Sequence, residues 1–107
     1  MKTKLSGLDR IMIPALLPTS GGKVEQILVK EIIDILVIHS EEILEFDLRD
    51  RPDGGLQWNA VKIQIEKEFD LKKQHTDLLK EAVITLDKNK GWNQNNLGTC
   101  LKIEKMR

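Results

Sequence analysis

The chain has 107 residues and a formal net charge of zero, with hydrophobic residues at 40% and charged residues at 32%. This length is typical of one domain with a real core, and the composition argues against disorder. A zero net charge gives no global attraction to nucleic acid or to an anionic membrane. We therefore expect a single domain over residues 1–107.

The cysteine content and the apolar runs predict a compartment. Cys100 is the only cysteine, so no internal disulfide can form and a reducing environment is the natural interpretation. The apolar run 32–38 is interrupted by Asp34 and is too short to span a bilayer, and no secretory pattern opens the chain. We expect a cytoplasmic protein without a membrane partner.

The N-terminal part begins with residues 1–10, which look like a loose start. Residues 11–17 are apolar, with Pro14 inside the run and Pro18 directly after it. Because proline cannot donate a ladder hydrogen bond, this run is the candidate for an edge strand. The turn at 19–22 follows, where Thr19 or Ser20 is the expected cap of the next helix.

Residues 22–39 are predicted to form a long helix that is apolar on more than one face. One stripe comprises Val24, Ile27, Leu28, Ile32, Ile35 and Leu36. A second stripe comprises Val29, Ile33 and Val37. A surface helix needs one apolar stripe, so we expect the second to be covered by another subunit. A homodimer through Val29, Ile33 and Val37 is the favoured assembly.

The middle of the chain changes from helical to alternating periodicity. Alternating apolar residues on both sides of the turn at 51–55 predict a β-hairpin over about 44–68. Residues 71–87 then predict a helix with one apolar stripe and Asp70 as its cap. The tail should dock on the core as a helical turn or an extended segment. The predicted fold class is α+β, with a small antiparallel sheet packed against the helices 22–39 and 71–87.

No pattern of metal-binding or catalytic residues stands out. His39, His75 and Cys100 lack the close spacing of zinc ligands, although the sequence leaves open whether they converge in a cleft. The turn at 19–23 departs from a phosphate-binding loop, because Val24 occupies the position of the magnesium-binding Ser or Thr. The acids between residues 41 and 53 are interleaved with arginines, unlike a calcium loop. We expect no cofactor, no metal and no enzymatic activity.

Trp92 and the basic C-terminal residues are the candidates for partner contact. Trp92 lies in polar sequence, where an indole can anchor a protein partner, stack on a base, or simply fix the end of the chain to the core. Lysines that could contact phosphates follow or precede it: Lys88, Lys90, Lys102 and Lys105. Nucleic acid is the weaker of the two partner hypotheses, because the net charge is zero.

The order of these segments resembles small uncharacterised proteins of bacteriophages and prophages. The resemblance rests on the apolar run 11–18 that ends in proline, the long apolar helix, the turn of Ser40, Glu41 and Glu42, the hairpin, and a helix closing in Leu86, Asp87 and Lys88. It implies an accessory or assembly role and no particular activity or site residue.

Two functions are therefore predicted, in order. The first is a small non-enzymatic interaction or assembly protein, for which the resemblance implies a phage or mobile-element origin. The alternative is a nucleic-acid-associated accessory factor that uses the basic C-terminal segment. An enzyme ranks third, because it would need His39, His75, Cys100 or the acids to gather from distant parts of the chain.

Overall fold

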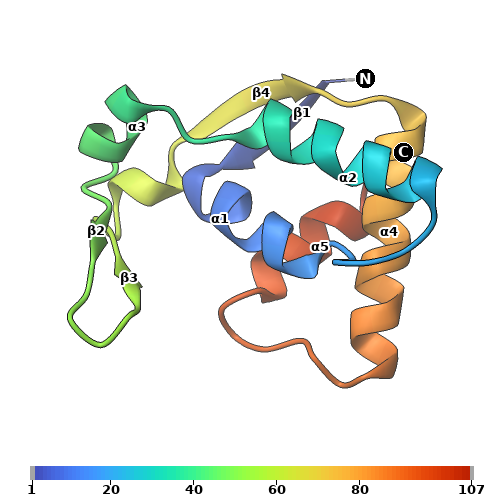
Figure 1. Cartoon of the computed structure of the whole chain (residues 1–107). Coiled ribbons are helices and arrows are strands. Elements are labelled where there is room, and N and C mark those ends of the chain that lie inside the picture. Colours follow the sequence, from blue (N-terminus) through green and yellow to red (C-terminus); the bar gives the residue numbers. More distant parts are fainter. Residues whose placement is uncertain (1, 107) are drawn as a thin grey trace.

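The computed structural model describes residues 2–106 and has an α+β fold, which confirms the predicted fold class (Figure 1). Along the chain the elements are β1 (Lys2–Ser6), α1 (Gly7–Leu16), α2 (Lys23–Leu36), α3 (Ser40–Glu45), β2 (Arg49–Asp50), β3 (Leu56–Gln57), the 3-10 turn η1 (Lys62–Gln64), β4 (Glu66–Asp70), α4 (Lys73–Lys88) and α5 (Leu97–Glu104). Within residues 2–106, no helix combines the length and the apolar character needed to cross a membrane.

Residues 2–6 form β1, and residues 11–16 are helical with Leu17 as the extended C-cap, so the predicted loose start and edge strand are both wrong. Ser6 ends β1 and caps α1: its Oγ accepts from the Asp9 N–H at 3.2 Å, while the Asp9 carboxylate accepts from the Ser6 N–H at 2.9 Å. This reciprocal capping box favours the helix. Pro14 is tolerated inside α1 on its exposed side, and Ile13 is fully buried.

The sheet is formed by β1 and β4, which lie far apart in the sequence. They pair antiparallel with Lys2 opposite Asp70 and Ser6 opposite Glu66. The predicted hairpin over 44–68 is therefore wrong in its extent, because only the two-residue strands β2 and β3 pair with each other. The buried Ile63 in η1 redirects the chain, and β4 leaves to join β1. In Figure 1 the β2–β3 ribbon extends away from the helices.

The two main helices lie where the sequence predicts them, although their caps differ. Gly22 is the N-cap of α2 and provides no side-chain cap, so neither Thr19 nor Ser20 has that role. Lys72, not Asp70, is the N-cap of α4, because Asp70 is the last residue of β4. The predicted apolar stripe of α4 is confirmed as its buried face, with His75 at its start.

The core forms where α1, α2, α4 and α5 meet the sheet. The buried apolar residues come from these helices, from β1 and from the segments beside them, and they are Leu5, Ile13, Leu17, Val29, Ile32, Leu36, Leu71, Leu78, Leu79, Val83, Cys100, Ile103 and Met106. The tail therefore docks on the core as the helix α5. On α2 the buried residues are Val29, Ile32 and Leu36, so the core stripe differs from the predicted one. Val24 and Ile27 lie outside it and are exposed, because α4 covers only one side of α2.

Candidate interaction surface

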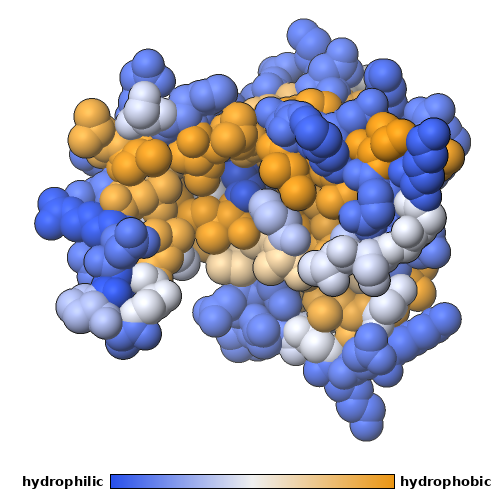
Figure 2. Space-filling view, in the orientation of Figure 1, coloured by the Kyte–Doolittle hydropathy of each residue, from blue (hydrophilic) through white to orange (hydrophobic). Residues whose placement is uncertain are grey.

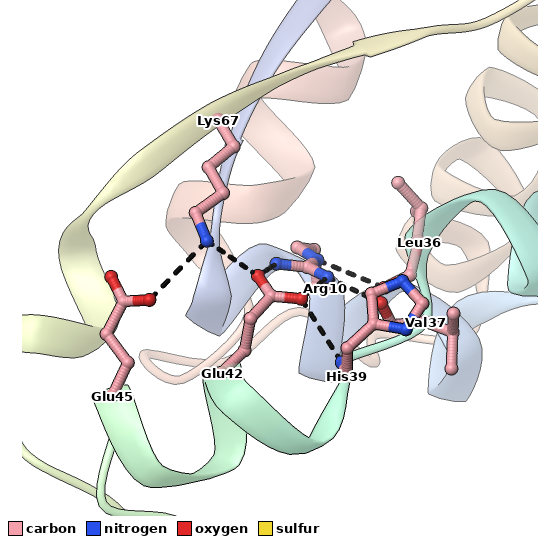
Figure 3. Close-up of polar contacts among 7 residues, drawn as sticks. All are labelled: Arg10, Leu36, Val37, His39, Glu42, Glu45 and Lys67. Carbon is pink, nitrogen blue, oxygen red and sulfur yellow. Dashed lines mark hydrogen bonds and ion pairs between the residues drawn. The ribbon is translucent and has the colours of Figure 1, made fainter.

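Arg10 holds the turn between α2 and α3. This arginine comes from α1 and is buried, and its Nε and Nη2 donate to the carbonyl oxygens of Leu36 and Val37 at the end of α2 (Figure 3). These are helix-terminal carbonyls that have no partner within α2 itself. The guanidinium also lies 4.9 Å from the ring centroid of Phe69. One side chain thus caps α2 and ties it to α1 and β4.

Glu42, in the first helical turn of α3, is the second residue that holds the connection between α2 and α3. Its carboxylate accepts two hydrogen bonds from Arg10, one from Lys67 Nζ at 2.9 Å and one from the His39 N–H at 3.1 Å (Figure 3). The bidentate bond from Arg10 is the main reason that the pKa of Glu42 is held far below its ordinary value, against the effect of burial. The same carboxylate raises the pKa of Lys67. A buried, fully bonded ion pair therefore fixes how α3 follows α2.

An apolar band lies along the outside of this turn. We define the band as Ile27, Ile33 and Val37 from α2 and the residue after it, Ile43 and Leu44 from α3, and Leu56 from β3. Each is exposed to solvent, and Leu44 most of all, at 82%. Figure 2 shows apolar surface that runs from α3 across α2. Exposed apolar side chains that gather on one face in this way are typical of contact sites for other molecules.

The band includes a shallow hollow beside the β2–β3 ribbon. The hollow has a volume of about 270 Å³ and is lined by the apolar residues Ile38, Ile43, Leu48 and Leu56 and by the charged residues Arg49 and Asp50. A combination of apolar and charged residues of this kind is typical of protein contact sites. Because α3 and the ribbon both follow the turn that Arg10 and Glu42 hold, this hollow depends on the same ion pair.

Of the three residues predicted to form a subunit interface, two are exposed in the structure and one is buried. Ile33 and Val37 are exposed and belong to the band. Val29 is only 8% exposed and packs in the core, so it is not available to a partner. The correction follows from the direction in which α2 meets α4: Val29 points to the same side as Ile32 and Leu36. Ile27, a member of the other predicted stripe, is exposed and lies on the outside of α2.

Trp92 is packed against its own chain. Its indole is half-buried against the core, and its Nε1 donates to the Val83 carbonyl oxygen at 3.3 Å. Its polar group is therefore occupied within the chain, as expected of a residue that fixes a loop to the core.

The basic residues do not gather into one patch. Lys88 and Lys90 lie at the end of α4, whereas Lys102 and Lys105 border a hollow of about 500 Å³ with Lys2 and Lys4. Glu66 lines the same hollow, and Lys102 Nζ bonds both to it and to Asp9. Glu68 and Asp70 stand opposite Lys4 and Lys2 in the sheet. Acidic groups therefore accompany the cations along β1, β4 and α5.

The histidines and the cysteine have structural partners. His75 is buried; its Nδ1 accepts from the Lys72 N–H at 3.1 Å, and its Nε2 lies 2.9 Å from Glu31 Oε1. The ring therefore joins α4 to α2. His39 gives its backbone N–H to Glu42, and Cys100 is fully buried, where burial raises the pKa of its thiol. Among residues 2–106, no three His, Cys, Asp or Glu side chains are grouped to hold a metal ion.

Among the residues that organise this surface, only Glu42 belongs to a turn that the sequence indicates, together with Ser40 and Glu41. Arg10 and Asp9 lie in the segment that was predicted to be a loose start, and Glu42 and Lys67 lie 25 residues apart. One local signal exists: Ser6 and Asp9 have the spacing of a capping box before an apolar run. The ion pairs themselves join distant segments and leave no local pattern.

Comparisons of the chain with protein-family models, with curated proteins and with solved structures found no match.

Proposed function

We propose that this chain is a small non-enzymatic interaction or assembly protein that binds another protein through the apolar band. The observation that carries the proposal is the band itself: exposed apolar side chains come from α2, α3 and β3, and two of them line a hollow together with Arg49 and Asp50. The buried ion pair of Arg10 and Glu42 supports it, because this pair holds the elements that present the band. An accessory role of this kind fits the resemblance to phage proteins, and the single buried cysteine fits the cytoplasm.

The alternative, an accessory factor that contacts nucleic acid, receives less support. Phosphate contacts require lysines whose charge is not already compensated. Lys102, one of the four predicted lysines, bonds two carboxylates, and the indole N–H of Trp92 donates to the Val83 carbonyl oxygen. The side chains of the apolar band, in contrast, are exposed to solvent and are not covered by other parts of residues 2–106.

Site-specific photocrosslinking in living cells tests the proposal. A photoreactive phenylalanine analogue replaces Leu44 or Val37 in the band, and Ile84 on the exposed side of α4 serves as the matched control. We expect discrete crosslinked products, including one whose yield falls when Ile43→Glu is added, and none from position 84. The proposal is overturned if the band positions give no product beyond that of the control.

A further inference from the structure

The exposed side of α2 carries a pattern of apolar and charged residues that is complementary to its own reverse. Ile27, Lys30, Asp34 and Val37 follow spacings of three, four and three residues, so they lie along one side of the helix. Ile27 is 49% exposed and Val37 is 45% exposed, while the side chains of Lys30 and Asp34 are 77% and 62% exposed. The order along this side is apolar, cation, anion, apolar.

This order is complementary to itself when a second α2 runs antiparallel. A two-fold axis midway between Lys30 and Asp34 places Ile27 of one copy opposite Val37 of the other. It also places each Lys30 opposite an Asp34. A parallel pair would place lysine against lysine and aspartate against aspartate, and like charges in an interface are strongly unfavourable. Charge therefore selects the antiparallel arrangement.

We propose that the partner of the apolar band is a second copy of this chain, with the two α2 helices antiparallel across a two-fold axis. This inference rests on the proposed function and specifies its partner. Ile27 and Val37 supply the apolar contacts, and each Lys30 pairs with the Asp34 of the other copy. Within one chain these two groups already lie 2.7 Å apart as an exposed pair at i and i+4, which contributes little to the stability of the monomer. The main effect of Lys30 and Asp34 is therefore to select the antiparallel orientation of the two α2 helices in the dimer.

Charge exchange in the purified protein tests the pairing. Lys30→Glu or Asp34→Lys alone sets like charges against each other, and we expect the dimer dissociation constant, measured by light scattering over a concentration series, to rise by about tenfold or more. The double variant should return close to the wild-type value, because it restores opposite charges. Lys73→Glu is the control, since Lys73 and Asp77 form an equally exposed pair on α4.

Cysteine crosslinking tests the direction. Residues 27 and 37 are about 15 Å apart along one helix, too far for a disulfide within a chain. We expect Ile27→Cys combined with Val37→Cys to give a covalent dimer on oxidation, and either single variant to give none above the wild-type background. Efficient crosslinking by the single variants would overturn the antiparallel arrangement. So would a double charge variant that dissociates like the single ones.

The two proposals fail in different experiments. A purified chain that is monomeric at every concentration would overturn the dimer, whereas the proposed function would still stand if photocrosslinking in cells gave a discrete product of another mass. Absence of any product in cells would overturn the proposed function itself.

Discussion

Glu42 is the residue whose replacement should affect the turn between α2 and α3 most. Its carboxylate faces Arg10, whose side chain is only 2% exposed. We predict that Glu42→Gln lowers the free energy of unfolding by about 3 kcal/mol, because it leaves a buried guanidinium without its counter-charge. Denaturant-induced unfolding at neutral pH measures the change.

Glu45→Gln is the matched control for this prediction. Glu45 also lies near Lys67, at 3.5 Å, but its side chain is 39% exposed. An exposed pair of this kind is worth no more than about 1 kcal/mol, so the control should change stability little. Equal losses in the two variants would contradict the view that burial of Arg10 is decisive.

At the scale of elements, α1 depends on a glycine at its first position. A Cβ on Gly7 would lie 2.9 Å from Phe46 Cε2 and 3.0 Å from Ile63 Cδ1, and both side chains are buried. We predict that Gly7→Ala lowers the free energy of unfolding by about 1–3 kcal/mol through overpacking. Thermal or denaturant-induced unfolding of the wild type and of the variant measures this decrease in the free energy of unfolding.

Gly98, inside α5, gives the opposite expectation. A Cβ at this position meets no other atom within 4 Å. Gly98→Ala should therefore raise the free energy of unfolding by up to about 1 kcal/mol, because alanine favours the helix. A stabilising Gly7→Ala would contradict the close packing of α1 against Phe46 and η1.

The elements also show what the sequence could and could not predict. The stripe of α4 was predictable because it repeats at helical spacing within one segment. The helical state of residues 11–16 was missed because Pro14 lies inside this run and proline is unfavourable in a helix interior, although the spacing of Ser6 and Asp9 pointed to a helix cap. The pairing of β1 with β4 joins residues that are 60 or more positions apart, and the periodicity within a short segment cannot predict such a contact. The apolar band was predicted in part, through Ile33 and Val37.

At the scale of the whole molecule, two carboxylates should set the stability in acid. Burial alone would raise the pKa of Asp9, but hydrogen bonds from Lys102 and Thr99 hold it below its ordinary value, and Arg10 does the same for Glu42. Both groups thus keep their charge to lower pH in the folded chain than in the unfolded one. Their contribution is present above the ordinary carboxyl pKa of about 4 and is lost as pH falls below it.

We therefore predict that the free energy of unfolding decreases as pH falls from about 5 towards 2, and that Glu42→Gln flattens this decrease. Urea unfolding at a series of pH values measures both slopes. The same slope in the wild type and in the variant would show that other carboxylates govern the acid sensitivity.

The bonds of Asp9 to Thr99 and Lys102 bear on how the chain folds as it leaves the ribosome. Asp9 emerges early, yet its partners lie 90 and 93 residues later in α5, and β1 must wait for β4. During synthesis the apolar side of α1 is therefore without its final cover until α5 has been translated. Folding that depends on such late contacts is slow and leaves nascent chains open to aggregation. Nascent chains arrested before α5 should consequently be far more sensitive to protease than the released protein.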